Sequence, residues 1–285
     1  MKIRGYWVRS FYFFSSKKPV VSGLGVFRNC LIEKQGSEYP MKKVKIGCLA
    51  RFFNPYSEEV DFAKKNNFDF MQLWYDHRGL VLHPDDGDFI ETINAHNFPT
   101  IIHAVLNINE FVTHIPKLFE ILKQLKQTEL IVHPVCKNEG IDERTIDRLD
   151  ESIKFALDYL MPHGITLYLE NNSKLDPIFT DSWEIEKIFK QNDHLEFICD
   201  LAHIDHLEHL KEMVGFKIPQ ILHIADRRLH VVHEHLPIGQ GDIDFEYIFK
   251  QILPDFEGKI ILEIIKEDAD IVKSKNIISS LINNG

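Results

Sequence analysis

EFICDLAH, residues 196–203, is the stretch from which the fold of this 285-residue chain is best predicted. A short apolar run ends in Asp200, and His203 follows three positions later. The run has the length of a buried strand, and both polar residues can bind a metal ion or move a proton. If the same pattern recurs along the chain, it predicts repeated strands with their polar residues gathered at one face.

Seven other runs repeat this pattern on both sides of residues 196–203. They are KIGCLA at 45–50, FDFMQLWYD at 68–76, PTIIHAV at 99–105, LIVHPV at 130–135, ITLYLENN at 165–172, QILHIADR at 220–227 and KIILEII at 259–265. Segments with helical spacing are expected from residue 57 onward and at 109–127, 142–160, 182–191, 206–214, 245–253 and 269–283. A strand followed by a helix, eight times, predicts an α/β protein with a parallel sheet.

The number of runs favours a closed barrel over an open sheet. An open dinucleotide-binding sheet would carry G-x-G-x-x-G after its first strand, and this chain has no such motif there. We therefore predict a single-domain (β/α)8 TIM barrel spanning residues 41–285. In such a barrel the carboxyl ends of all strands open onto one face, so their polar residues would converge on one pocket.

Charge and composition narrow the classes of function. The net charge of -10 argues against a protein that binds polyanions through bulk electrostatics. No run reaches the roughly 18 apolar residues of a spanning helix, so no membrane association is expected. The four cysteines show no C-x-x-C spacing, which favours a reducing cytoplasm and no disulfides.

The first 40 residues differ from the rest of the chain. They hold seven Lys/Arg and two Asp/Glu, and they contain no apolar stretch with a small-residue cleavage site. We interpret residues 1–40 as an N-terminal extension of uncertain order, with a basic targeting segment as the alternative. Met41-Lys42-Lys43 directly precedes the first strong strand.

Four residues at neighbouring strand ends form the predicted core of the site. Glu170, Asp200, His223 and Glu263 lie at the ends of the last four runs. Carboxylates completed by a neutral imidazole suit a divalent cation such as Mn, Co, Mg, Fe or Zn, which can hold a hydroxy-carbonyl fragment and make its C–H more acidic. Glu170 and Glu263 are then the predicted catalytic acid and base. Taken singly, each acidic residue is as readily explained as a solvated strand end.

Further histidines extend this predicted ligand set. His133 ends the fourth run, while His203 and His235 follow the sixth and seventh, and all three are predicted metal ligands. His103 and His233 are possible additional ligands. A lone histidine in an apolar run is more often a core residue whose hydrogen bonds are satisfied within the protein. Metal binding is favoured here because these histidines share a position at or after the ends of strands.

Five residues are predicted to contact the substrate. Trp74 would line the mouth of the barrel and stack on a sugar ring, although core packing is the commoner role of such an aromatic residue. Gly239 and Gly241 lie in the loop after the seventh run, where free N–H groups can bind phosphate. Arg227 would supplement that loop, with a solvated surface charge as the alternative. Asn171 directly follows the glutamate of the fifth run.

These motifs, in this order, resemble those of the xylose isomerase-like barrel superfamily. The resemblance covers residues 41–285 and depends most on IVHP, LEN, CDLAH, LHIAD, HLPIGQGDIDF and ILEI. The superfamily includes sugar and sugar-phosphate isomerases and epimerases, inosose dehydratases and abasic-site endonucleases of the endonuclease IV type. Its epimerase branch uses a Glu, Asp, His, Glu set for one metal, which Glu170, Asp200, His223 and Glu263 match. The resemblance implies that the two glutamates also carry the proton transfers.

The endonuclease branch of that superfamily uses a larger ligand set for three zinc ions. His103, His133, His203 and His235 fall where its further histidines would lie. That branch has an aspartate two residues before the last histidine, whereas this chain has His233. Only 29 residues separate His103 from His133, with no long insertion that would grip DNA. Both departures weaken the resemblance to this branch.

The sequence therefore favours a metal-dependent sugar or sugar-phosphate isomerase or epimerase with a small-molecule substrate. The alternative is an endonuclease IV-like zinc phosphodiesterase acting on abasic DNA, and nucleic acid is a partner only in that case. A non-catalytic metal-binding barrel is the third hypothesis, but a scaffold has no need for so many buried polar groups in one pocket. A homo-oligomer is compatible with each of these.

Overall fold

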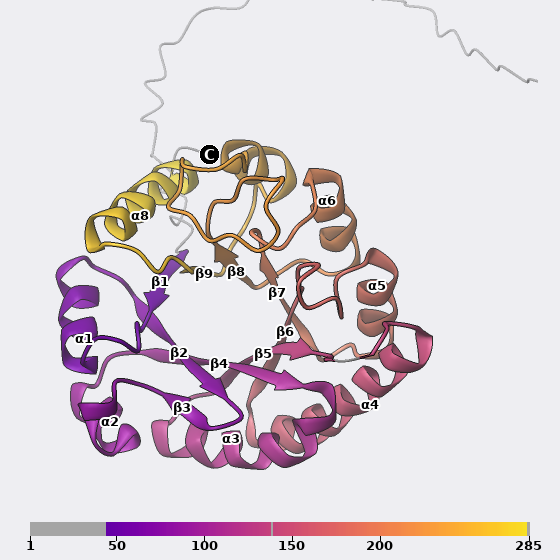
Figure 1. The fold of residues 1–285 in the computed structure, drawn as a ribbon, viewed down its shortest axis with the longest axis horizontal. Coiled ribbons are helices and arrows are strands. Elements are labelled where there is room, and N and C mark those ends of the chain that lie inside the picture. Colours follow the sequence, from indigo (N-terminus) through magenta and orange to yellow (C-terminus); the bar gives the residue numbers. More distant parts are fainter. Residues whose placement is uncertain (1–43, 138, 284–285) are drawn as a thin grey trace, which may run out of the picture. The chain divides into compact units, whose positions relative to one another are not determined.

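The computed structural model describes residues 44–137 and 139–283, so the predicted extension at residues 1–40 lies outside the described residues. Eight parallel strands form a closed ring in the order β1, β9, β8, β7, β6, β5, β4 and β2, and β2 pairs with β1 again. Figure 1 looks down this ring and shows the helices surrounding it. The predicted single-domain (β/α)8 TIM barrel is confirmed.

The strands coincide with the eight predicted runs, with one short addition. Their bounds are β1 Lys45–Leu49, β2 Phe70–Asp76, β3 Gly79–Val81, β4 Thr100–Asn107, β5 Glu129–Val135, β6 Thr166–Glu170, β7 Glu196–Asp200, β8 Ile221–Ile224 and β9 Lys259–Leu262. The addition is β3, which pairs antiparallel with β2 and takes no part in the ring.

The α-helices alternate with the strands of the ring. They are α1 Tyr56–Lys65, α2 Phe89–His96, α3 Phe111–Leu125, α4 Glu143–Leu160, α5 Ser182–Gln191, α6 Leu207–Phe216, α7 Phe245–Tyr247 and α8 Asp268–Asn283. Three 3-10 turns lie at Pro84–Asp86, Ile108–Glu110 and Met161–His163, and a π-helical turn at Ile248–Ile252 continues α7. None of the helices within the described part of the chain is long and apolar enough to cross a membrane.

Helix α2 was not expected from the sequence, and its burial explains why. Ile93 is the only fully buried residue in its eight, and Phe89 one turn earlier is partly buried against the core, so its apolar face is short. Its sequence signal lies at the start, where the Asp88 side chain accepts a hydrogen bond from the Glu91 backbone N–H at 2.9 Å. Asn97 ends the helix in the left-handed conformation.

Side chains inside the ring form two stacked layers, and the period of two along each strand explains both. The lower layer is apolar and consists of Phe70, Ile101, Ile131, Tyr168, Ile198, Ile221 and Ile261. Two positions further along the same strands come Gln72, His103, His133, Glu170, Asp200, His223 and Glu263. Because residues two apart in a strand face the same side, the polar layer lies directly above the apolar floor.

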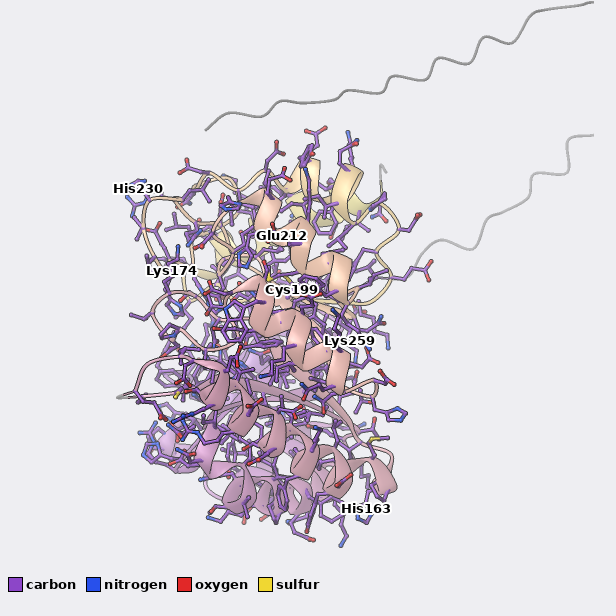
Figure 2. All side chains as sticks on the ribbon, turned by 90° about the vertical axis from the view of Figure 1, so that its right-hand side faces the viewer. His163, Lys174, Cys199, Glu212, His230 and Lys259 are labelled. Carbon is purple, nitrogen blue, oxygen red and sulfur yellow. The ribbon has the colours of Figure 1, made fainter. Side chains whose placement is uncertain are left out.

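The end of the barrel above this polar layer is built by loops that follow the strands. Figure 2 shows Lys174, after β6, and His230, after β8, at this end of the molecule. Lys259 at the start of β9 and His163 before β6 lie toward the opposite end in the same view. The polar layer is therefore at the carboxyl ends of the strands, where barrel enzymes carry their active sites.

Candidate metal centre

Seven polar side chains from seven different strands or strand ends meet at the carboxyl end of the barrel. They are Gln72, His103, His133, Glu170, Asp200, His223 and Glu263, and none of them is more than 7% exposed. Side chains that can carry charge are rarely buried so completely unless they pair with one another or bind a metal. Of these seven, only Gln72 was not predicted as a site residue from the sequence.

Glu170 is at the centre of this layer. Its Oε2 lies 2.6 Å from His103 Nε2 and 3.1 Å from His133 Nδ1, and its Oε1 lies 2.7 Å from His223 Nδ1. Burial alone would raise the pKa of Glu170, but the imidazoles of the three histidines hold it well below its usual range. Glu170 is therefore a carboxylate in the folded protein, with both oxygens facing nitrogen ligands.

The same carboxylates act on the histidines in the opposite direction. Burial alone would lower the pKa of His133, but Glu170 and Asp176 raise it to about 10. Burial would likewise lower the pKa of His223, but Glu263 and Glu170 raise it to about 9. In the absence of a cation, these imidazoles are thus protonated and supply the positive charge that the carboxylates require.

Gln72 connects three of the predicted ligands. Its Nε2 donates to Glu263 Oε1 at 2.7 Å and lies 3.2 Å from His103 Nδ1. Its Oε1 can only accept, so the contact of 2.7 Å with His223 Nε2 requires that this nitrogen carries a proton. Gln72 thereby leaves His223 Nδ1 as the nitrogen that can bind a metal. The sequence signal was one amide within the apolar part of β2, before Asp76.

A second group of ligand atoms lies beside Glu170 and is short of partners. Asp200 Oδ2, His203 Nε2 and His235 Nε2 are all buried, and none has a hydrogen-bond partner among the described residues. His203 Nε2 is 3.2 Å and His235 Nε2 is 3.9 Å from Asp200 Oδ2. Burial lowers the pKa of His203 to about 3 and raises that of Asp200.

These unpartnered atoms decide whether the site fits a metal. A neutral imidazole is the form of histidine that binds a cation, and the Nε2 atoms of His203 and His235 both face one carboxylate oxygen of Asp200 here. Leaving a buried polar atom without a partner costs about 1–3 kcal/mol, and a divalent ion among these three atoms would remove that cost. The residues present therefore fit a divalent cation.

His233 is the most exposed of the predicted ligands. Its ring stacks on that of His203 with centroids 4.9 Å apart, and its Nδ1 lies 3.3 Å from Ser173 Oγ. Neighbouring His235 places Nδ1 3.6 Å from Glu263 Oε2 and 3.1 Å from the Glu263 carbonyl oxygen. The structure thus brings His233 close to the other histidines. An imidazole stands here where the endonuclease branch would have an aspartate.

The described residues offer four overlapping groups whose ligand atoms lie within 4.8 Å of one another. They are Glu170, Asp200, His223 and Glu263; His103, Glu170 and His223; His133, Glu170 and His203; and His203, His233 and His235. The first group is the core quartet predicted from the sequence, and the others include every further histidine predicted as a ligand. Glu170 belongs to three of the four groups.

Three of the predicted substrate residues make contacts within the protein. Trp74 is half-buried and packs edge-on against His103, with ring centroids 5.1 Å apart. The Asn171 side chain donates to the Asp200 carbonyl at 3.2 Å and accepts from its N–H at 2.8 Å, so it ties β6 to β7. Arg227 is buried and donates to the Ile204 carbonyl, which differs from both expected roles, phosphate contact and solvated charge.

The Gly239–Gly241 loop also has a different role from the predicted one. The N–H groups of Gly239 and Gly241 each donate to Asp226 Oδ2 at 2.8 Å. Two further N–H groups, those of Arg227 and Ile243, donate to Asp226 Oδ1. These donors are therefore engaged by a carboxylate of the chain itself, and they do not form a phosphate site in this arrangement.

Comparison with known proteins places the chain among related barrels. A family model described as a xylose isomerase-like TIM barrel matches residues 60–281. No curated protein matches the sequence. Similar solved structures include a D-tagatose 3-epimerase-like protein, with 20% identity, a TM-score of 0.66, and coverage of 85% of this chain and 98% of that one.

Two other similar structures are a protein with bound zinc and an endonuclease. The IOLI protein, solved with a zinc atom, shares 14% identity at a TM-score of 0.68, with coverage of 85% of this chain and 99% of that one. Endonuclease IV from Thermus thermophilus shares 18% identity at a TM-score of 0.62, with coverage of 85% of this chain and 100% of that one. At these identities the likeness establishes the fold alone.

Proposed function

This chain belongs to the xylose isomerase-like TIM barrel family, and on that premise we propose that it is a metal-dependent hydrolase of phosphate esters with more than one divalent ion in its centre. Zinc is the ion that best suits a set of imidazoles and carboxylates. A homo-oligomer and a cytoplasmic location remain predictions from the sequence.

The observation that carries this proposal is the number of ligand atoms beyond the core quartet. A single ion bound by Glu170, Asp200, His223 and Glu263 would leave His203 Nε2 and His235 Nε2 buried without a partner. Each such atom costs about 1–3 kcal/mol, a cost that a second ion would remove. The arrangement is therefore better suited to several ions than to one.

The shared carboxylates support the same conclusion. Glu170 presents one oxygen to His223 and the other to His103 and His133, so its two oxygens lie between separate groups of nitrogen ligands. Paired divalent ions, when bound, clamp the attacking and leaving oxygens of a phosphate ester and lower the pKa of water. Gln72 would hold Glu263 and His223 in position through its amide.

A small phosphate ester is the substrate class that the surface favours over duplex DNA. The net charge of -10 opposes association with a polyanion, whose binding depends largely on Lys and Arg contacts to phosphates. Cleavage of abasic duplex DNA is accordingly expected to be weak. Abasic duplex DNA should be tested in the same assay, so that its cleavage can be compared directly with that of the small ester.

The isomerase that the sequence favoured remains the second candidate, and one observation supports it. Glu170, Asp200, His223 and Glu263 form a complete four-ligand group by themselves, with all ligand atoms within 4.8 Å. Glu170 and Glu263 could then exchange protons with a sugar held between them. In that case the histidines outside the quartet would contribute to substrate contact and not to metal binding.

The two candidates predict different effects of removing a histidine outside the quartet. For the hydrolase, His235→Ala is expected to lower the zinc-dependent turnover of bis(p-nitrophenyl) phosphate by about 10- to 100-fold or more, since it removes a ligand. The exposed His194 is a matched control, because His194→Ala changes a histidine outside the site.

The assay separates the outcomes cleanly. Wild-type turnover that falls in His235→Ala and persists in His194→Ala supports the hydrolase. The isomerase would replace the hydrolase if wild-type protein showed no zinc-dependent diester cleavage but isomerised a ketose, and if Glu263→Gln lost that isomerisation.

A further inference from the structure

A small apolar cavity opens beside the metal centre and has no part in metal binding. Its volume is about 110 Å³. Phe52 and Phe53 from the loop after β1 and Ile265 from the loop after β9 line it together with Trp74 of β2. Segments more than 200 positions apart in the sequence thus form one cavity at the carboxyl end of the barrel.

The exposure of these side chains calls for an explanation. Phe52 is 48%, Phe53 is 50% and Ile265 is 52% exposed, so three of the 11 exposed large apolar side chains in the described part of the chain line this one cavity. The rings of Phe52 and Phe53 pack edge-on, with centroids 5.9 Å apart and an interplanar angle of 77°, and therefore form two walls at a steep angle. Exposed apolar clusters of this kind mark sites where a ligand binds.

The polar residues of the cavity wall are already engaged. The Arg51 guanidinium pairs with Glu59 at 2.8 Å and with Asp268 at 2.7 Å. Both amide atoms of Gln72 are bound within the metal centre, to Glu263 and to His223. A ligand group in the cavity would therefore find both Arg51 and Gln72 engaged elsewhere, with the Trp74 indole N–H as the one other side-chain donor in the described wall, and an apolar group fits better than a sugar or a nucleobase.

The cavity adjoins the metal centre through two shared residues. Gln72 lines the cavity and also contacts three of the predicted ligands. Trp74 lines it as well and packs against the His103 ring. Only the side chains of Gln72 and Trp74 therefore lie between a group in the cavity and the predicted ligands. One small molecule can bridge such a separation, with one part in the cavity and another at the metal centre.

We propose that the substrate carries one apolar ring that binds between Phe52, Phe53, Trp74 and Ile265 while its phosphate group binds at the metal centre. The volume of about 110 Å³ is below the roughly 150 Å³ of a closed apolar cavity that accepts benzene, so the ring would lie partly in the open side of this one. Aromatic walls bind rings through offset or edge contacts. This inference rests on the proposed function for its phosphate half and identifies the class of ester, an aryl ester.

Binding of two inert probes to zinc-loaded protein tests the proposal without requiring turnover. Phenylphosphonate and methylphosphonate share the metal-binding group and differ only in the ring. Calorimetry is expected to show that phenylphosphonate binds at least about tenfold more tightly than methylphosphonate. Burial of an aromatic ring contributes enough free energy to raise the affinity by more than a factor of ten. In the Phe52→Ala/Phe53→Ala double variant, this ratio should fall to near one.

Val112→Ala provides the matched control, because Val112 is an exposed apolar residue of α3, 61% exposed and outside the cavity. This variant should keep the tenfold ratio. Equal affinities of the two phosphonates for the wild type, no binding of either one, or a phenyl preference that survives in the double variant would each overturn the proposal.

The result is distinguishable from failure of the proposed function. A phenyl preference without any zinc-dependent ester hydrolysis would remove the hydrolase and keep the aryl site. Hydrolysis of esters without a phenyl preference would keep the hydrolase and remove the aryl site.

Discussion

Single residues set the chemistry of the centre through their contacts with one another. Glu170 brings two sets of imidazoles together because each of its oxygens faces different histidines. Gln72 is neither acid nor base, but it fixes which nitrogen of His223 carries a proton. An amide at this place orients the ligands without adding a charge to a buried site that already holds several.

Replacement of this amide should weaken metal binding without altering the fold. Gln72→Leu removes the contacts to Glu263, His103 and His223, and we expect zinc affinity to fall by about 10- to 100-fold. A competition titration with a chelator measures the affinity. Gln124→Leu, on the exposed side of α3, serves as the control. Unchanged affinity in Gln72→Leu would show that Gln72 does not position the ligands.

Among the elements, the loop between β8 and α7 shows how a carboxylate can organise backbone without any ligand. Asp226 accepts hydrogen bonds from four backbone N–H groups of this loop. A Cβ at Gly241 would lie 2.4 Å from Asp226 Oδ1 and 2.5 Å from the Arg227 nitrogen, so only glycine allows this close approach. The loop thereby holds His235 at a defined distance from the metal centre.

Helix α5 contains a buried acid outside the centre and gives a pH prediction. Burial raises the pKa of Glu184 to about 7, although the Thr180 N–H donates to its Oε2 at 2.8 Å. A carboxyl group whose pKa is higher in the folded than in the unfolded state stabilises the fold below its unfolded value, and this contribution is lost as the pH rises through 7. Wild-type protein should therefore lose up to about 3 kcal/mol from this group between pH 4.5 and 8.

Glu184→Gln directly tests whether the titration of Glu184 lowers the stability of the fold as the pH rises. The amide keeps an acceptor for Thr180 but never becomes charged, so the variant should gain stability relative to wild type between pH 5 and pH 8 in urea unfolding. Glu186→Gln, in the same helix and paired on the surface with Lys190, should show little change with pH. A Glu184→Gln difference that does not vary with pH would show that the buried carboxyl does not titrate in this range.

At the scale of the whole molecule, the barrel was predictable because its signals are local. Seven strands of the ring carry an apolar residue followed two positions later by a polar one, as in Ile198 and Asp200, and closure of the ring then places every such pair in the same two layers. The core quartet, His103 and His133 could be identified from this pattern, whereas His203, His233 and His235 were identified from their place after the strands. The structure brings all of them together at one end of the barrel.

The features that escaped prediction depend on contacts between distant parts of the chain. Gln72 contacts Glu263 across 191 positions, and nothing near Gln72 in the sequence indicates that partner. Phe52 and Ile265 share a cavity only because β1 pairs with β9 as the ring closes. The glycines after β8 resembled a phosphate loop, and their donors bind Asp226 because the chain turns back onto β8.

The number of metal ions per chain tests the central claim most directly. The quartet of Glu170, Asp200, His223 and Glu263 and the group of His203, His233 and His235 share no residue, so we assign at least one ion to each. Native mass spectrometry of protein reconstituted with zinc should therefore show more than one ion per chain. A single tightly bound ion, unaffected by His203→Ala or His235→Ala, would contradict the multinuclear hydrolase.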